Sequence, residues 1–287
     1  MVSKDTQIAA ALQTRFGSRS TISKLSSADS ELFRVDYKDR DAVIVKFPQK
    51  LAHVEVAILG EFNRIGISTP KVIGELRIRC GSGSIEGYTM EFVSNAILLR
   101  DKGDEGYRRV VEGFLPRVLR KLSTVKTDGF GPFDHYGHGL YRSESAFARS
   151  ILRRIKERGT DTSEYLPLAY AFMRRNGFTE QRHGVLAHTD LYNNILIGKS
   201  IYVIDPQTSV SAGPAAWDEC SFRIYEAVYR EEGISRQLNE LINRKDTRFA
   251  FYTFLFALER YSYYRHNRKE KAPLMKEIYQ RAFRRIE

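Results

Sequence analysis

The chain has 287 residues, of which 42% are hydrophobic, and its net charge at pH 7 is +11. This length and composition allow one large domain or two modest lobes with a core, and they argue against wholesale disorder. No run of about eighteen apolar residues occurs, which excludes a membrane-spanning helix, and two cysteines supply neither a disulfide framework nor a metal cluster. The charged N-terminus has no apolar signal region, so a reducing cytoplasm is the expected location.

The first 93 residues are predicted to form a small sheet with helices. Apolar residues at helical spacing predict helices over 6–16 and 51–65. Alternating or apolar runs bounded by turn residues predict strands, at 20–25, 31–37, 42–47, 71–79 and 87–93. The Gly-Ser-Gly-Ser stretch over 81–84 is expected to connect the last two strands.

Helices dominate from about residue 95. Apolar residues at helical spacing predict helices over 107–122, where Pro116 interrupts the pattern, and over 144–157, 163–176, 215–231 and 248–264. The only strands expected in this half are 195–197 and 201–204. We therefore predict an α+β, bilobal protein, with a small β-rich lobe over 1–93, a larger, mostly helical lobe over 94–287, and a hinge near 91–96.

The positive charge is concentrated near the C-terminus. Residues 260–287 hold nine basic and three acidic side chains. Such a segment suits nucleic acid or another anionic partner. The commoner explanation is a helix with one solvated basic face, since Met275, Ile278, Phe283 and Ile286 recur between the charges at roughly helical spacing.

The stretch AHTDLYNNILIGKSIYVIDPQ, residues 187–207, places acidic and amide side chains around two short apolar runs. If the runs pair as a hairpin, its open ends bring Asn194 and Asp205 together, with Asp190 one turn away. A carboxylate and an amide oxygen suit Mg²⁺, and a carboxylate outside the metal could accept a proton from an attacking hydroxyl. Taken singly, these residues are ordinary turn formers, and His188 is ordinarily a buried, hydrogen-bonded side chain.

Three fragments, His188-Thr189-Asp190, Asn194-Ile195-Leu196 and Ile204-Asp205, together resemble the catalytic and metal-binding segments of the aminoglycoside phosphotransferase-like kinases. That group includes choline and fructosamine kinases and has a bilobal protein-kinase-like fold. The resemblance implies that Asp190 is the catalytic base and that Asn194 and Asp205 bind Mg²⁺. It gives His188 and Asp218 structural roles, with Asp218 bracing the catalytic loop.

The resemblance also implies a nucleotide site in the first lobe. Lys46, on the predicted strand 42–47, would contact the α- and β-phosphates and pair with a helix glutamate. Glu55 is the first choice for that partner and Glu61 the second. Ser27 would bind phosphate from the nucleotide loop.

The adenine site is expected just before the hinge. Backbone groups of Glu91 and Val93 would hydrogen-bond the adenine, and Met90 would line its pocket. Ordinary core packing explains Met90 equally well.

Several features depart from the family's pattern. The step from Asp190 to Asn194 is four residues, one fewer than usual, so either the loop is shorter or Asn193 takes part of the metal-binding role. The nucleotide loop, 25–31, has no glycine, and Glu31 would repel phosphate if it turned inward. Pro206-Gln207 follows Asp205 in place of Phe-Gly, which argues against a eukaryotic-type protein kinase.

The function that these residues indicate is transfer of a phosphoryl group from ATP or GTP, with Mg²⁺, to a hydroxyl of a small molecule such as an aminoglycoside or another antibiotic. A polycationic acceptor would need acidic residues of the helical lobe, for which the candidates are Asp218, Glu226, Glu231, Glu232 and Glu259. The alternative is a kinase-like pseudoenzyme that binds an anionic partner, and a protein kinase ranks third. No membrane partner is expected, and the protein would be a monomer or homodimer.

Overall fold

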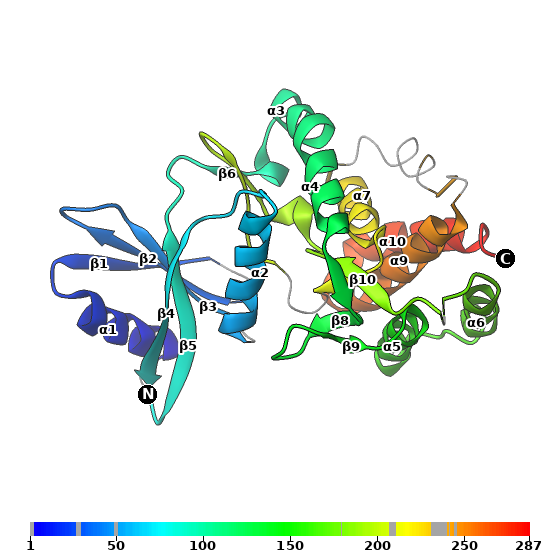
Figure 1. Ribbon diagram of the computed structural model, residues 1–287, viewed down its shortest axis with the longest axis horizontal. Helices are drawn as coiled ribbons and strands as arrows, with labels where there is room; N and C mark the ends of the chain where they lie inside the picture. Colours follow the sequence, from blue (N-terminus) through cyan, green and yellow to red (C-terminus); the bar gives the residue numbers. More distant parts are fainter. Residues whose placement is uncertain are drawn as a thin grey trace. The chain divides into compact units, whose positions relative to one another are not determined.

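The structure, a computed structural model, describes residues 3–26, 30–48, 51–178, 180–206, 211–230, 240, 242–243 and 246–287. The chain divides into two compact units, shown with their helices and strands in Figure 1. The first comprises Met1–Leu98 with Ile195–Thr208, and the second comprises Leu99–Asn194 with Ser209–Glu287. This division confirms a β-rich N-terminal part and a helical C-terminal part. It groups the later segment 195–208 with the first unit, and the predicted lobe boundary after residue 93 stays a prediction.

The first unit is built on an antiparallel sheet of order β1-β2-β3-β5-β4. Its strands are β1 Ser20–Leu25, β2 Ser30–Tyr37, β3 Val43–Pro48, β4 Val72–Cys80 and β5 Gly83–Glu91. All five predicted strands are confirmed. The predicted connection over 81–84 is wrong in extent, because Cys80 already pairs with Gly83. A two-residue turn suffices here, since Gly81 adopts a left-handed conformation (φ +61°) that glycine tolerates.

Two helices pack on this sheet, α1 Lys4–Phe16 and α2 Ala52–Arg64. Helix α1 buries Ile8 and Leu12 against a core that contains Val45 and Phe47. Because successive side chains of a strand point to opposite faces, Lys46 projects to the other face. That face carries Tyr88, which packs with Ala52 and Leu59 of α2. The alternation of strand β3 therefore directs the lysine toward α2.

A smaller sheet of order β12-β11-β6 completes the first unit. Its strands are β6 Ile97–Leu98, β11 Ile195–Ile197 and β12 Ile201–Val203. The hairpin predicted within 195–204 is confirmed, with Ile195 opposite Val203. The amide of Val203 also donates to the carbonyl of Ser68, 2.8 Å away, which ties the hairpin to the loop after α2.

The second unit is mainly helical. Its longer helices are α4 Leu115–Thr124, α5 Glu144–Glu157, α6 Tyr165–Arg175, α7 Trp217–Arg230, α9 Thr247–Asn267 and α10 Ala272–Phe283. The interruption predicted at Pro116 within 107–122 is confirmed, and the segment is not one continuous helix. It is divided into α3 Asp104–Arg109, a π-helical turn Val110–Phe114 and α4. Pro116 explains the break, since proline lacks an N–H and its ring crowds the carbonyl four residues earlier.

The second unit also contains short strands that the sequence pattern does not predict. They are β7 Lys126–Asp128, β8 Phe130–Phe133, β9 Gly139–Tyr141, β10 His183–Leu186 and β13 Ala212–Gly213, in the order β7-β10-β13-β8-β9. Strands of two to four residues are too short to display alternation. Strand β10 matters most for function, because it leads directly into His188-Thr189-Asp190.

The C-terminal segment forms a helix with a buried face. Met275, Ile278, Phe283 and Ile286 are all buried, and α10 packs along α9 (Figure 1). The helical interpretation of the basic segment is therefore confirmed. Among the described residues, no helix combines the length and apolar character needed to cross a membrane.

Candidate active site

In the first unit, Lys46 lies at the centre of a charged cluster. Its ammonium forms an ion pair with Glu55 of α2 and another with Asp205, whose Oδ1 lies 2.5 Å from Nζ. The Lys46 and Glu55 side chains are only 5% and 2% exposed, whereas that of Asp205 is 38% exposed. Glu55 is thus the partner of Lys46. The second choice, Glu61, pairs with Arg64 at 2.5 Å instead.

Burial and charge oppose each other in this cluster. Burial disfavours the charged form of Lys46, but the carboxylates of Glu55 and Asp205 outweigh it and raise the pKa of the lysine above its ordinary value. Burial raises the pKa of Glu55, although Lys46 acts in the opposite direction. A cation held between two carboxylates keeps its charge in the interior.

Two further residues maintain the cluster, and the sequence analysis missed both. The hydroxyl of Tyr88 donates to Oε1 of Glu55 at 2.8 Å, from the position directly opposite Lys46 in the sheet. At the preceding position, Gly87, a Cβ would collide with the carbonyl of Lys46 and the ring of Phe47. Pairing of the predicted strands 42–47 and 87–93 is the signal that could have identified Tyr88, because it places Tyr88 opposite Lys46.

In the second unit, Asp218 forms hydrogen bonds with the segment His188-Thr189-Asp190. This buried carboxylate accepts hydrogen bonds from the amide of His188, at 3.0 and 3.1 Å, and from the amide of Thr189. The bracing role implied for Asp218 is confirmed. Burial raises the pKa of Asp218 to about 6, and the two backbone donors oppose this shift.

The loop is conformationally constrained at its centre. Thr189 has φ +72°, a left-handed conformation that is uncommon for a β-branched residue. Its amide bond to Asp218 helps to hold this conformation. His188 is fully buried, and its Nδ1 accepts from the amide of Asp190 at 3.3 Å. His188 therefore shapes the loop, as the resemblance implied.

The shortened step from Asp190 to Asn194 is spanned by a 3₁₀ turn, Leu191–Asn193. The side-chain amide of Asn193 donates to Oδ1 of Asp190 at 2.7 Å, and that of Asn194 donates to the Asp190 carbonyl at 3.0 Å. A 3₁₀ turn advances the chain with fewer residues per turn than an α-helix. The missing residue is therefore accommodated without loss of order, and the two asparagines take different positions around Asp190.

The proposed metal ligands lie in different units. Asp205 follows β12 with φ +52°, in the first unit. Asn194 is 8% exposed and belongs to the second. Because the Asn194 amide nitrogen is engaged with Asp190, its carbonyl oxygen is the atom suited to a cation. A carboxylate and an amide oxygen fit the preferences of Mg²⁺, and their joint binding of one ion stays a prediction. In the described part of the chain, no group of three or more His, Cys, Asp or Glu is arranged to hold a metal.

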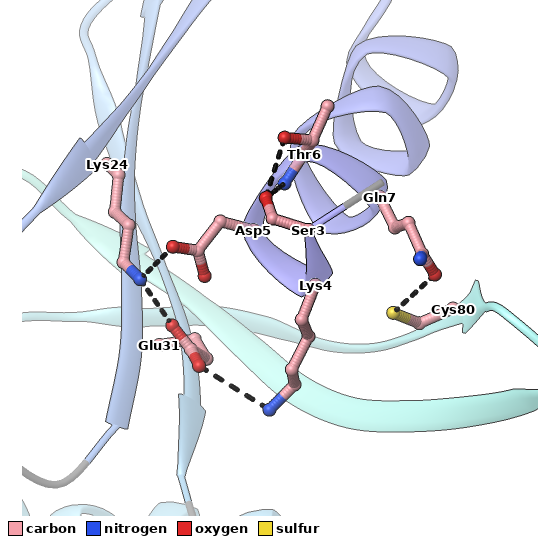
Figure 2. Close-up of polar contacts among 8 residues, drawn as sticks. All are labelled: Ser3, Lys4, Asp5, Thr6, Gln7, Lys24, Glu31 and Cys80. Atoms are coloured by element: carbon pink, nitrogen blue, oxygen red, sulfur yellow. Dashed lines mark hydrogen bonds and ion pairs between the residues drawn. The ribbon is translucent and has the colours of Figure 1, made fainter. Parts of the chain in front are cut away.

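The nucleotide loop is described only in part, and Ser27 lies outside the described residues. At the loop's far end, Glu31 is paired with Lys24 at 2.9 Å and with Lys4 at 3.4 Å (Figure 2). Lys24 also contacts Asp5 of α1 at 2.6 Å. The carboxylate of Glu31 is thus directed toward α1 and partly neutralised, which reduces the repulsion expected for phosphate.

The residues predicted to bind adenine are located at the end of β5. Met90 and Glu91 are its last two residues, and Val93 follows. All three are half-buried. Met90 packs against the Ala52, Leu59 and Tyr88 cluster, so it has a core contact. Their contact with adenine stays a prediction.

A buried arginine lies near Asp190, and the sequence analysis did not identify it. Arg260 of α9 lies over the rings of Phe256 and Tyr225, with its guanidinium carbon 5.0 and 5.6 Å from the ring centroids. Burial opposes its charge, but Tyr225, Glu259 and Asp190 are among the groups that raise its pKa. The contribution of Asp190 shows that the two side chains interact electrostatically. Only the fold reveals it, because α9 is distant in sequence.

The architecture is similar to that of solved small-molecule kinases. A thermostable mutant of aminoglycoside phosphotransferase APH(4)-Ia, in ternary complex with AMP-PNP and hygromycin B, superposes with a TM-score of 0.74 at 16% identity, covering 98% of this chain and 99% of that one. A choline/ethanolamine kinase family protein from Mesorhizobium loti gives 0.59 at 12% identity, covering 99% of each chain. At such identities the similarity establishes the fold, which is the fold that the motifs predicted. No protein-family model matches the chain, and no curated protein sequence matches it.

Proposed function

We propose that this protein transfers the γ-phosphoryl group of ATP to a hydroxyl group of a small molecule. The observation that carries this proposal is the buried Lys46–Glu55–Asp205 cluster, which occurs together with a braced loop that presents Asp190. Burying a lysine between two carboxylates costs desolvation energy. A fold retains such a cluster most readily where the cation has a ligand to bind. The structural neighbour solved with AMP-PNP and hygromycin B supports the same assignment.

In this proposal each residue has a defined task. Lys46 binds the α- and β-phosphates, with Glu55 and Tyr88 fixing its direction. Asp190 accepts the proton of the substrate hydroxyl as that oxygen attacks the γ-phosphorus in line with the departing ADP oxygen. Asn193 orients the Asp190 carboxylate through its 2.7 Å hydrogen bond. Most of the rate enhancement then comes from positioning and from charge neutralisation.

The residues suited to hold Mg²⁺ are Asn194 and Asp205. When bound, the ion would neutralise charge on the β- and γ-phosphates. Asp205 already contacts the Lys46 ammonium at 2.5 Å, so its carboxylate would have to bind the ion and the ammonium together. Its 38% exposed side chain has a solvent-facing side for this purpose.

The acceptor is proposed to be a neutral or weakly charged hydroxyl compound. Among the acidic residues considered for a polycation, Glu226 bonds to Tyr107 and Arg223, Asp218 braces the loop, and Glu259 pairs with Arg154. Glu231 and Glu232 lie outside the described residues. The acidic groups whose contacts are described are therefore engaged within the protein. Neutral hydroxyls, including those of antibiotics, fit better than a polycationic aminoglycoside.

The test is a screen of hydroxyl compounds and antibiotics for Mg²⁺-dependent ADP release, run with ATP and with GTP. The Asp190→Ala protein should show no turnover on any acceptor found, while still binding ATP. Asp128→Ala, at an exposed strand residue, is the matched control and should remain fully active. Full activity of Asp190→Ala would refute the assignment. Absence of Mg²⁺-dependent ATP binding would favour the alternative of a kinase-like binding module.

A further inference from the structure

A groove of about 420 Å³ lies between helices α5 and α6 of the second unit. Four basic residues line it, Arg149, Arg153, Lys156 and Arg174, together with Leu152, Leu166 and Tyr170. Among the residues that the structure describes, its lining includes no acidic side chain and no member of the Asp190 loop. The groove is therefore a chemically distinct feature with a formal charge of about +4.

The helical period explains how these side chains converge. Positions 149, 153 and 156 of α5 are separated by four and three residues, which places them on one face of that helix. Positions 166, 170 and 174 of α6 repeat every four residues. The four basic side chains are exposed, Tyr170 and Leu166 are half-buried, and Leu152 is fully buried. The groove thus has a cationic rim around two partly accessible apolar side chains, Leu166 and Tyr170.

In the part of the chain that the structure describes, no carboxylate neutralises the cationic rim. Within the described ranges, none of the four basic residues has an acidic partner at ion-pair distance, whereas Arg154 of the same helix pairs with Glu259 at 3.0 Å. The guanidinium of Arg149 instead lies 5.4 Å from the centroid of the Tyr170 ring. Like charges that share a groove repel one another. An anion that enters would relieve this repulsion.

We infer that the groove binds a small molecule with two or more negative charges on an apolar or aromatic body, such as an aryl phosphate. Arginine suits phosphate because its guanidinium donates two parallel hydrogen bonds. The half-buried side chains of Leu166 and Tyr170 would contact the body. The volume lies within the range of small-molecule sites. Single-stranded nucleic acid would instead need a basic track along which successive bases stack.

The inference is tested by titrating the full-length protein calorimetrically with 1-naphthyl phosphate, in the presence of saturating AMP-PNP so that the proposed nucleotide site is occupied. One molecule should bind per chain. Naphthol, which has the body without the charge, and inorganic phosphate, which has the charge without the body, should each bind at least about tenfold more weakly. Equal binding of inorganic phosphate would overturn the proposed ligand class. Tighter binding to phosphatidylserine vesicles or to an acidic peptide than to 1-naphthyl phosphate would also overturn it.

Two double variants distinguish binding in the groove from nonspecific attraction of the anion to a basic protein. Arg149→Glu/Arg153→Glu should weaken binding of 1-naphthyl phosphate by at least about tenfold. Arg158→Glu/Arg175→Glu makes the same charge change at exposed residues outside the groove and should leave binding within about twofold. Equal weakening in both proteins would refute a specific site. Tyr170→Leu preserves the charge and should weaken binding of 1-naphthyl phosphate without changing the thermal unfolding midpoint by more than a few degrees. Unchanged binding in this variant would overturn the aromatic part of the proposed ligand.

Discussion

The ammonium of Lys46 lies 2.5 Å from a carboxylate oxygen of Asp205, although 159 positions separate the two residues in the sequence. The same ammonium pairs with Glu55, so one cation links strand β3, helix α2 and the segment after β12. This contact lies within a single compact unit of the chain. It makes the stability of that unit depend on groups that the proposed chemistry also requires.

The Lys46–Glu55 pair can be tested by a double-mutant cycle. Lys46→Met leaves Glu55 buried without its cation, so this change should lower the free energy of unfolding by about 3–5 kcal/mol. Lys46→Met/Glu55→Gln should cost clearly less than the sum of the single changes, because both charges are removed together. Urea unfolding of the wild type, Lys46→Met, Glu55→Gln and the double variant measures the cycle. Glu61→Gln, which breaks the surface pair with Arg64, is the control and should cost less than about 1 kcal/mol. Strict additivity in the cycle would contradict the coupling.

Alanine variants of Asn193 and Asn194 should differ in their kinetic effects. Asn194→Ala removes a proposed Mg²⁺ ligand, so the Mg²⁺ concentration for half-maximal rate should rise by about tenfold. Asn193→Ala removes the hydrogen bond to the Asp190 carboxylate, so kcat should fall by about tenfold with little change in the Mg²⁺ requirement. Steady-state rates over a Mg²⁺ series distinguish them. A shifted Mg²⁺ requirement in Asn193→Ala alone would assign the metal-binding role to Asn193.

The buried carboxyl of Asp218 predicts a pH dependence of stability. Its folded pKa of about 6 lies above the ordinary value of 3.8, so the folded state binds more protons in this interval. Stability should therefore fall as pH rises from about 4 to about 6, by up to about 3 kcal/mol from this group. Asp218→Asn removes the titration but keeps a hydrogen-bond acceptor.

Chemical unfolding of the wild type and Asp218→Asn across this pH range measures the effect. Glu144, whose pKa burial raises to about 7 despite Arg248, contributes with the same sign in both proteins and cancels in the difference. The difference in unfolding free energy between the two proteins should change across the interval. Parallel curves would show that Asp218 does not titrate there.

Two glycines of the first unit should respond in opposite ways to alanine. Gly87→Ala pushes the new methyl group into the Lys46 carbonyl and the Phe47 ring, so it should destabilise the protein by about 1–3 kcal/mol. A Cβ at Gly60, in α2, would meet no atom within 4 Å. Gly60→Ala should therefore raise the free energy of unfolding by about 0.5–1 kcal/mol. Thermal unfolding checks both. ATP affinity should fall only in Gly87→Ala, and an unchanged affinity there would mean that β3 adjusts without moving Lys46.

The sequence by itself determined the strands and helices that are long enough to show an apolar period. The five strands of the first sheet, helix α5 over 144–157 and the hairpin after Asn194 all follow from local apolar patterns. It also marked the residues at which chemistry was expected, because Asp and Asn at the ends of apolar runs stand out against the surrounding sequence. The short strands of the second unit were missed, since two to four residues carry no period. Pro116 marked an interruption in the helical pattern but did not specify the π-helical turn Val110–Phe114.

The tertiary structure decided contacts that no local pattern of the sequence indicates. The family resemblance ranked Glu55 above Glu61 as the partner of Lys46, but nothing local to Lys46 indicates that Asp205 shares the same cation. The same is true of the hydrogen bond from Tyr88 to Glu55 and of the electrostatic interaction between Arg260 and Asp190. The bracing role of Asp218, by contrast, was already implied by the resemblance. Electrostatic interactions depend on distance in space and on burial, and neither is a property of neighbouring residues in the chain. The sequence therefore supplied the groups, and folding selected their partners.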